Sequence, residues 1–175
     1  MGDILDNVFG TSSSSFSVAA WIRPFSLSSS QTNHKTQNCF VAKASDLYND
    51  NFEMGVNTNG TIHVYIDTSG KDKYADFGVA GSINLGSWNF VVLMYDNGSV
   101  SVTINGSRYE DTKTWKGGGN IDSATGSIFS IGSSQHNDNY FFGMIDEVMI
   151  FSNALTDDDI TSLSTLTHTC LGTCY

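Results

Sequence analysis

One segment near the C-terminal end of the chain constrains its fold more than any other part of the sequence. Residues 142–155 read Phe-Gly-Met-Ile-Asp-Glu-Val-Met-Ile-Phe-Ser-Asn-Ala-Leu. Because successive side chains of a β-strand point to opposite faces of a sheet, this alternation of apolar and polar residues predicts a strand with at least one buried face. Strict alternation places Ile145, Glu147, Met149 and Phe151 on one face, and Asp146, Val148 and Ile150 on the other.

Short segments of the same kind recur along the chain, separated by turn residues. The clearest pair is 88–95 and 99–104, joined through Asp96-Asn97-Gly98, because Asn-Gly supplies the positive φ values of a tight hairpin turn. No helical period separates the segments, so we predict an all-β sandwich of antiparallel sheets. A short helix is expected after Thr156, which would cap an acidic first turn. The other predicted strands are 16–23, 39–43, 51–56, 62–67, 74–79 and 127–132.

Length, composition and charge exclude several classes of protein. The 175 residues fit one domain, 1–175, with a core over about 10–165. A net charge of −10 with only 8 Lys and Arg argues against nucleic-acid binding, since nothing neutralises a run of phosphates. No apolar run reaches the ~20 residues that a membrane span needs. The first residues do not form a signal peptide, so we interpret the chain as a segment of a larger secreted or cell-surface protein.

The three cysteines predict two different roles. Cys39 lies in an apolar run and is expected to be a buried free thiol that packs like a small hydrophobic residue. Cys170 and Cys174 flank Gly172 in the C-terminal tail. They either close a small disulfide loop in an oxidising compartment or pair with a neighbouring domain.

Five segments in order resemble the laminin-G-like and pentraxin-like domains. They are Phe-Ser-Val-Ala-Ala-Trp-Ile-Arg-Pro at 16–24, Gly-Ser-Trp-Asn-Phe-Val at 86–91, Val-Thr-Ile-Asn-Gly at 102–106, Phe-Ser-Ile-Gly at 129–132 and the segment 142–155. The resemblance covers nearly the whole chain. It implies a concanavalin A-like jelly roll of two antiparallel sheets. It also implies an extracellular, non-catalytic binding or adhesion module, whose partner is a glycan or a cell-surface glycoprotein, with neighbouring domains of the same parent protein.

The resemblance to pentraxins also implies a calcium site. Asp50-Asn51 precedes a predicted strand, as the Asp-Asn pair of pentraxins does. The partner loop after Gly132 offers one carboxylate, Asp138, so the two-calcium site of pentraxins is not expected. We expect one calcium held by Asp50, Asn51 and Asp138 together with carbonyl groups, since hard cations need several oxygen ligands. The alternative is that these are ordinary turn residues.

Aromatic residues among polar loop residues are the candidate sugar platforms. A sugar stacks its C–H face on a ring and offers its hydroxyl groups to amides and carboxylates. The alternative is that each ring covers the core beneath its loop. The candidates are Tyr48 with Asn49, Tyr140 with Asn137 and Asn139, and Trp115 beside the triple glycine 117–119.

The sequence argues against an enzyme. A glycoside hydrolase needs two carboxyl groups on one face, whereas Asp146 and Glu147 are adjacent and point to opposite faces of a strand. The laminarinase-type pattern Glu-x-Asp-x-x-Glu is absent from the chain. Asp146 is expected to have a structural role with a buried partner. Two alternatives to a lectin-like module remain: a protein–protein adhesion or spacer domain and, less favoured, a glycoside hydrolase.

Overall fold

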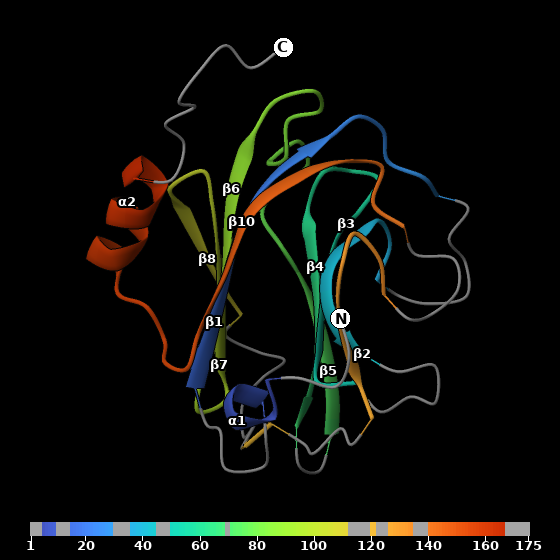
Figure 1. Ribbon diagram of the computed structural model, residues 1–175. Helices are drawn as coiled ribbons and strands as arrows, with labels where there is room; N and C mark the ends of the chain where they lie inside the picture. Colours follow the sequence, from blue (N-terminus) through green and yellow to red (C-terminus); the bar gives the residue numbers. More distant parts are fainter. Residues whose placement is uncertain are drawn as a thin grey trace.

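The computed structural model is a sandwich of two antiparallel β-sheets, each of five strands (Figure 1). It describes residues 5–9, 15–29, 36–44, 50–68, 71–111, 120–121, 126–134 and 140–166. The first sheet contains, in spatial order, β10 (Gly143–Phe151), β1 (Ser15–Pro24), β6 (Asn89–Asp96), β7 (Ser99–Ile104) and β8 (Ser107–Asp111). The second contains β5 (Lys71–Phe77), β4 (Ile62–Thr68), β3 (Phe52–Val56), β2 (Cys39–Ala44) and β9 (Ile128–Ile131). The predicted all-β class and jelly-roll architecture are confirmed.

The main core lies between the two sheets. Alternate residues of the strands point inward, so both inner faces are removed from water. Aromatic rings join the sheets: the centroids of Phe16 on β1 and Phe52 on β3 lie 5.7 Å apart, and Tyr95 on β6 stacks on Phe16 at 5.6 Å. Phe9, from the short helix α1 (Asp6–Phe9), contacts both Phe16 and Phe52. The helix α1 was not predicted from the sequence.

A second apolar cluster lies on the outer face of the first sheet, where helix α2 (Asp157–Leu166) covers it (Figure 1). Leu155 and Ile160 are buried there against Ala19, Val92 and other outward residues of β1 and β6. This burial explains why the outward residues of β6 are apolar, as the sequence indicated for a strand covered on both faces.

The N-terminus of α2 is capped as predicted. The Oγ1 of Thr156 accepts a hydrogen bond from the backbone N–H of Asp159 at 3.2 Å. The carboxylate of Asp159 in turn accepts from the N–H of Thr156 at 3.0 Å. This reciprocal arrangement satisfies two backbone donors that the helix itself leaves unpaired.

Strand β10 departs from strict alternation at a β-bulge. Glu147 has a positive φ of 49°, and the ladder with β1 shifts register between Ala19 and Trp21. As a result Ile145 packs into the main core with Val148 and Ile150. The predicted grouping of Ile145 with Met149 and Phe151 is therefore wrong. The extra residue at the bulge exchanges the inward and outward positions of the residues that follow it.

Asp146 stabilises this bulge. Its side chain is exposed, and Oδ1 accepts a hydrogen bond from the backbone N–H of Glu147 at 2.9 Å. The expected structural role fits this contact, but the expected burial is wrong. A carboxylate beside a backbone turn needs no buried partner, since water solvates its other oxygen.

Strand β8 was also missed in the sequence. Only Tyr109 of its residues packs against the core, while Arg108 and Glu110 are exposed, so the segment shows little apolar signal. It forms because Asn105 and Gly106, both with positive φ, close a tight hairpin from β7. The same geometry at Asn97 and Gly98 joins β6 to β7, as predicted.

We predict that Gly55→Ala destabilises the fold. A Cβ at this position on β3 would collide with the carbonyl oxygen of Gln37 and lie 2.8 Å from the methyl group of Thr36. We expect the free energy of unfolding to fall by about 2 kcal/mol, measured by urea denaturation. Thr58→Ala in the exposed β3–β4 turn is the control and should change stability by less than about 0.5 kcal/mol. Equal stability of Gly55→Ala and the control would contradict the packing of residues 36–37 on β3.

Candidate functional site

Asp50 and Asn51, two of the predicted calcium ligands, are turned inward. They are 2% and 1% exposed, at the end of the β2–β3 connection. The Oδ1 of Asn51 accepts a hydrogen bond from the Oγ of Ser127 at 3.3 Å. The same Ser127 Oγ accepts from the ammonium group of Lys43, which is fully buried, at 2.9 Å. These contacts tie the start of β3 to β2 and β9.

This cluster is a poor calcium site as far as it is described. The buried ammonium of Lys43 lies one hydroxyl group away from the amide oxygen of Asn51, so a divalent cation at that oxygen would be repelled. Among the described residues, no three His, Cys, Asp or Glu side chains form a group that could hold a metal ion. Asp138, the third expected ligand, lies outside the described residues. Calcium binding therefore stays a prediction.

Tyr140 lies away from Asp50 and Asn51. Strand β9 begins next to Ser127, whose hydroxyl donates to Asn51, and ends at Ile131. The N–H of the following residue, Gly132, donates to the carbonyl of Phe40 near the start of β2. Tyr140 forms a β-bridge with Ser133, just beyond that far end. The structure thus separates Tyr140 from Asp50 and Asn51 by the length of β9. Tyr140 is 60% exposed, as a sugar platform would be. The other sugar candidates, Tyr48, Asn49, Trp115, Asn137 and Asn139, lie outside the described residues.

A polar and aromatic cluster stands on the outer face of the second sheet. His63 on β4 is paired with Asp76 on β5, and the side chains meet: Nδ1 of His63 and Oδ1 of Asp76 lie 2.6 Å apart. Asn57 also hydrogen-bonds the carboxylate. These hydrogen bonds hold the pKa of Asp76 below its ordinary value, and the one with His63 has the largest effect. The side chain of Asp76 is 59% exposed, whereas that of His63 is 7% exposed.

The next cross-strand pair on this face adds two tyrosines. Tyr65 on β4 faces Tyr74 on β5, two residues along from His63 and Asp76. The ring of Tyr74 lies against the imidazole of His63, with centroids 5.9 Å apart and planes inclined by 30°. Tyr74 is 45% exposed. A buried histidine thus supports one side of an accessible ring, and a carboxylate stands beside it. We call Tyr74, Tyr65, His63 and Asp76 the tyrosine face.

A hollow of about 580 Å³ begins beside the tyrosine face. It lies between the edge strands β5 and β8 of the two sheets. Asp76 contributes to its β5 side, and Arg108, Tyr109 and Glu110 form its β8 side. Polar groups therefore continue from the tyrosine face across the open edge of the sandwich.

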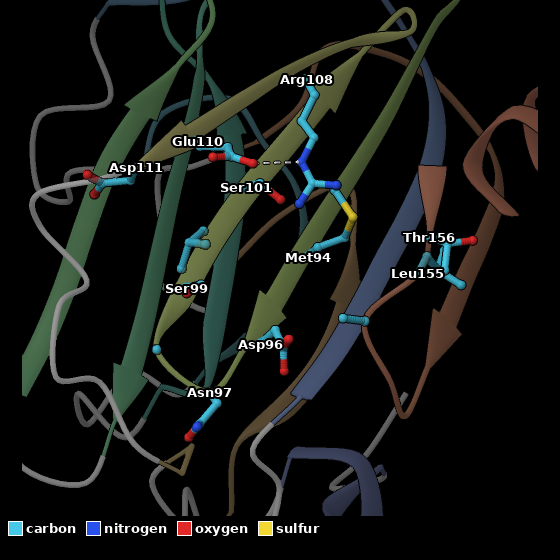
Figure 2. A pocket seen from close by; sticks show the side chains of 13 residues that line it. Met94, Asp96, Asn97, Ser99, Ser101, Arg108, Glu110, Asp111, Leu155 and Thr156 are labelled. Carbon is cyan, nitrogen blue, oxygen red and sulfur yellow. Dashed lines mark ion pairs between the residues drawn. The ribbon is translucent and has the colours of Figure 1, made fainter. Parts of the chain in front are cut away.

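A larger groove of about 770 Å³ lies on the opposite outer face, between β6–β8 and the segment that leads into α2 (Figure 2). We call it the α2 groove. Figure 2 shows Arg108 and Glu110 on one side, and Leu155 and Thr156 on the other. Its described lining includes no aromatic ring. The lining residues are Met94, Asp96, Asn97, Gly98, Ser99, Val100, Ser101, Arg108, Glu110, Asp111, Ala154, Leu155 and Thr156.

Cys39 is a buried free thiol, as predicted. Burial is the main cause of a pKa well above the usual value for this thiol, and the Glu53 carboxylate raises it further. The thiol therefore stays protonated and unreactive at neutral pH. Cys170 and Cys174 lie outside the described residues.

The chain belongs to the concanavalin A-like lectin/glucanases superfamily, whose family model matches residues 4–161. The resemblance to laminin-G-like domains is thereby confirmed. No curated protein matches the chain. No helix among the described residues is long and apolar enough to cross a membrane.

Three solved structures illustrate the fold that the chain shares. Domain 4 of AbnA, a GH43 extracellular arabinanase from Geobacillus stearothermophilus in complex with arabinotriose, has a TM-score of 0.60 at 24% identity, covering 87% of this chain and 67% of that one. The native heptameric SAP-like pentraxin from Limulus polyphemus has a TM-score of 0.60 at 21% identity, covering 87% and 70%. The CBM40 of the Ruminococcus gnavus IT-sialidase, bound to α2,3-sialyllactose, has a TM-score of 0.61 at 15% identity, covering 87% and 84%.

The tyrosine face was missed because its members were assigned to strands and not to a site. The signal was present: in 74–77 and 62–66, Tyr74, Asp76, His63 and Tyr65 occupy the positions between core residues. Period two puts them together on the outer face.

We predict that Asp76→Asn removes a pH-dependent contribution to stability. Since the pKa of Asp76 is lowered in the folded state, its stabilising effect is present above the unfolded value near 3.8 and is lost as the pH falls through the lower folded value. The wild-type protein should melt at a higher temperature than the variant at pH 5–7, and the gap should narrow below about pH 3.8. Asp158→Asn on the exposed first turn of α2 is the control. A gap that widens on acidification would contradict the lowered pKa.

Proposed function

We propose that this chain is a non-catalytic carbohydrate-binding module that holds an oligosaccharide against the tyrosine face. The observation that carries the proposal is the exposed ring of Tyr74, supported from behind by His63 and flanked by the carboxylate of Asp76. A supported ring costs little conformational entropy when it stacks on a sugar, and the fixed carboxylate accepts hydrogen bonds from hydroxyl groups. The hollow between β5 and β8 gives room for further sugar units.

Two solved structures of the same fold support the choice of ligand class, since one is in complex with arabinotriose and the other is bound to α2,3-sialyllactose. We propose a neutral sugar for this chain. Asp76 is on the tyrosine face, and the whole chain carries a charge of −10, so the carboxylate of an acidic sugar would be repelled. An extracellular location, with the glycan on a cell-surface glycoprotein or polysaccharide, belongs to the same proposal.

The geometry around Asp76 supports binding without catalysis. Two other described carboxylates lie on the outer face, Glu53 on β3 opposite Tyr65, and Asp67 on β4 opposite Asp72. From Asp76, Glu53 stands two strands across and two residues along, with Cα atoms about 12 Å apart, and Asp67 stands one strand across and four residues along, with Cα atoms about 14 Å apart. Glu53 is also fully buried. Glycoside hydrolases hold their two carboxyl groups ~5 to 9.5 Å apart in reach of the substrate.

We predict that Tyr74→Ala weakens glycan binding by about tenfold, the worth of a stacked ring. Arabinotriose is the first probe, and α2,3-sialyllactose, whose carboxylate should be repelled, is the acidic comparison. A glycan array follows, with affinities measured by calorimetry. Tyr140→Ala is the matched control, because Tyr140 is exposed too but lies beyond β9. If Tyr140→Ala lost glycan binding while Tyr74→Ala bound as tightly as the wild-type protein, the binding site would instead include Tyr140, as predicted from the sequence.

Calcium assistance is a separate proposal, tested by the same titrations with calcium and with a chelator. If Asp50, Asn51 and Asp138 hold calcium, the chelator lowers both the melting temperature and the glycan affinity. If neither quantity changes, Lys43 excludes the cation from the described part of that cluster and the calcium proposal fails. A reversible shift of several degrees on calcium addition would establish the metal site.

A protein–protein adhesion or spacer domain is the second candidate function. It is favoured by exposed aromatic residues at the β1–β10 end, where the rings of Phe25 and Phe142 meet at 6.0 Å and are 48% and 64% exposed. Met144 beside them is also exposed. Exposed apolar patches of this kind mark interaction surfaces. A glycan array without any binding, together with loss of partner binding in Phe142→Ser, would favour this function.

A further inference from the structure

The α2 groove lies apart from the tyrosine face and has a different chemistry. Its floor is formed by outward residues of the first sheet, Met94, Ser99 and Ser101, and its walls by β8 and by the segment before α2 (Figure 2). With no aromatic ring in its described lining, it lacks the stacking platform on which the proposed sugar site depends. The groove therefore calls for a ligand of another class.

The charge of the groove is negative. Three carboxylates, those of Asp96, Glu110 and Asp111, line it against one guanidinium, that of Arg108. Arg108 is already engaged with two carboxylates: Nε lies 3.2 Å from Glu110, and Nη1 donates to Asp157 at 2.8 Å. The carboxylate of Asp96 accepts a hydrogen bond from the neutral Ser15 hydroxyl at 2.7 Å, which leaves its charge in place.

The floor offers a second, independent feature. Ser101 is 5% exposed, and it lines the groove between Met94 and Glu110. Its hydroxyl makes no hydrogen bond to another side chain within the described part of the chain, and it is open to the groove rather than sealed in the core. The Ser101 hydroxyl, at the centre of the floor, is therefore available to donate a hydrogen bond to a ligand or to accept one from it.

The apolar part of the lining suits an amphipathic side chain. Met94 and Leu155 are 3% and 9% exposed and present methyl groups to the groove. A lysine or arginine side chain buries its methylene stem along such a surface and leaves its charged head for carboxylates at the rim. A backbone amide of the same segment can reach the Ser101 hydroxyl. We propose that the α2 groove binds an extended, basic peptide segment of a protein partner.

Asp96 and Glu110 set the spacing of the basic residues. The charge of Glu110 is only partly balanced, because its partner Arg108 is shared with Asp157. Asp96 is opposite Ser99, and Glu110 is opposite Ser101, on either side of β7. Their Cα atoms stand two strands across and two residues along, about 12 Å apart. In an extended peptide, residues i and i+4 are separated by about 13 Å. The groove therefore selects two basic residues with three residues between them.

Two peptides of identical composition test this spacing. The probe is acetyl-Lys-Gly-Gly-Gly-Lys-amide, and its control is acetyl-Lys-Lys-Gly-Gly-Gly-amide, which carries the same charge. Affinities for the full 175-residue chain are measured by calorimetry at low and physiological salt. We expect the spaced peptide to bind about fivefold more tightly and its affinity to fall with salt.

Protein variants test the site. Asp96→Asn should weaken the spaced peptide about fivefold and remove the preference over the control peptide. Asp158→Asn makes the same change in net charge on an exposed position outside the groove lining and should have no such effect. Ser101→Val, which replaces the floor hydroxyl with methyl groups, should also weaken binding, with circular dichroism to establish that it folds.

Equal affinities for the two peptides, or equal effects of Asp96→Asn and Asp158→Asn, would overturn the proposal, because attraction would then depend on net charge alone. The absence of peptide binding would overturn it as well, as would tighter binding of a glucosamine oligomer than of the spaced peptide. The proposal is independent of the sugar site: Tyr74→Ala should leave peptide affinity unchanged.

Discussion

Phe16 of β1 packs against Phe52 of β3, with ring centroids 5.7 Å apart. This contact joins the two sheets, and every other feature of the structure depends on their packing. A β-sheet with one apolar face is stable in water only when that face is covered. Here each sheet covers the inner face of the other, and Phe9 and Tyr95 extend the contact. The strands are thereby fixed, and with them the positions of all outward side chains.

The two outer faces are then free to differ. Helix α2 covers the outer face of the first sheet over β1 and β6, and the uncovered part over β7 and β8 becomes an acidic groove. The outer face of the second sheet carries a histidine, an aspartate and two tyrosines near its β5 edge. One fold thus presents two surfaces of different chemistry, which is how β-sandwiches with similar cores come to bind unrelated ligands.

Most of the fold could be predicted from the sequence because its signals are local. Alternation located the strands other than β8, and the Asn-Gly pair at 97–98 located a tight turn. Strand β8 escaped because its outward residues Arg108 and Glu110 are charged, and an edge strand needs only one apolar residue, Tyr109, to dock. The helix α1 escaped because it has only four residues, and Val8 and Phe9 anchor it through core contacts distant in sequence.

The candidate site was less predictable, since it depends on which loops and strands meet. Asp50 and Asn51 looked like metal ligands in the chain, but the distant Lys43 and Ser127 turn them into an internal network. Tyr74 and His63 meet only because β4 and β5 pair in one particular register. No pattern within either segment specifies that register. A comparison of the outward positions of β4 and β5 would have found the four residues of the tyrosine face, but these residue types do not form a sequence motif for a binding site.

The bulge at Glu147 means that β10 contains one residue more than its ladder with β1 requires. On either side of it, Asp146 pairs with Trp21 and Met149 with Ala19, each already facing the correct way. A chain lacking Glu147 would therefore form an uninterrupted ladder with the same inward and outward residues. The closing strand can gain or lose a residue at this point in evolution while its neighbours keep their places in the core.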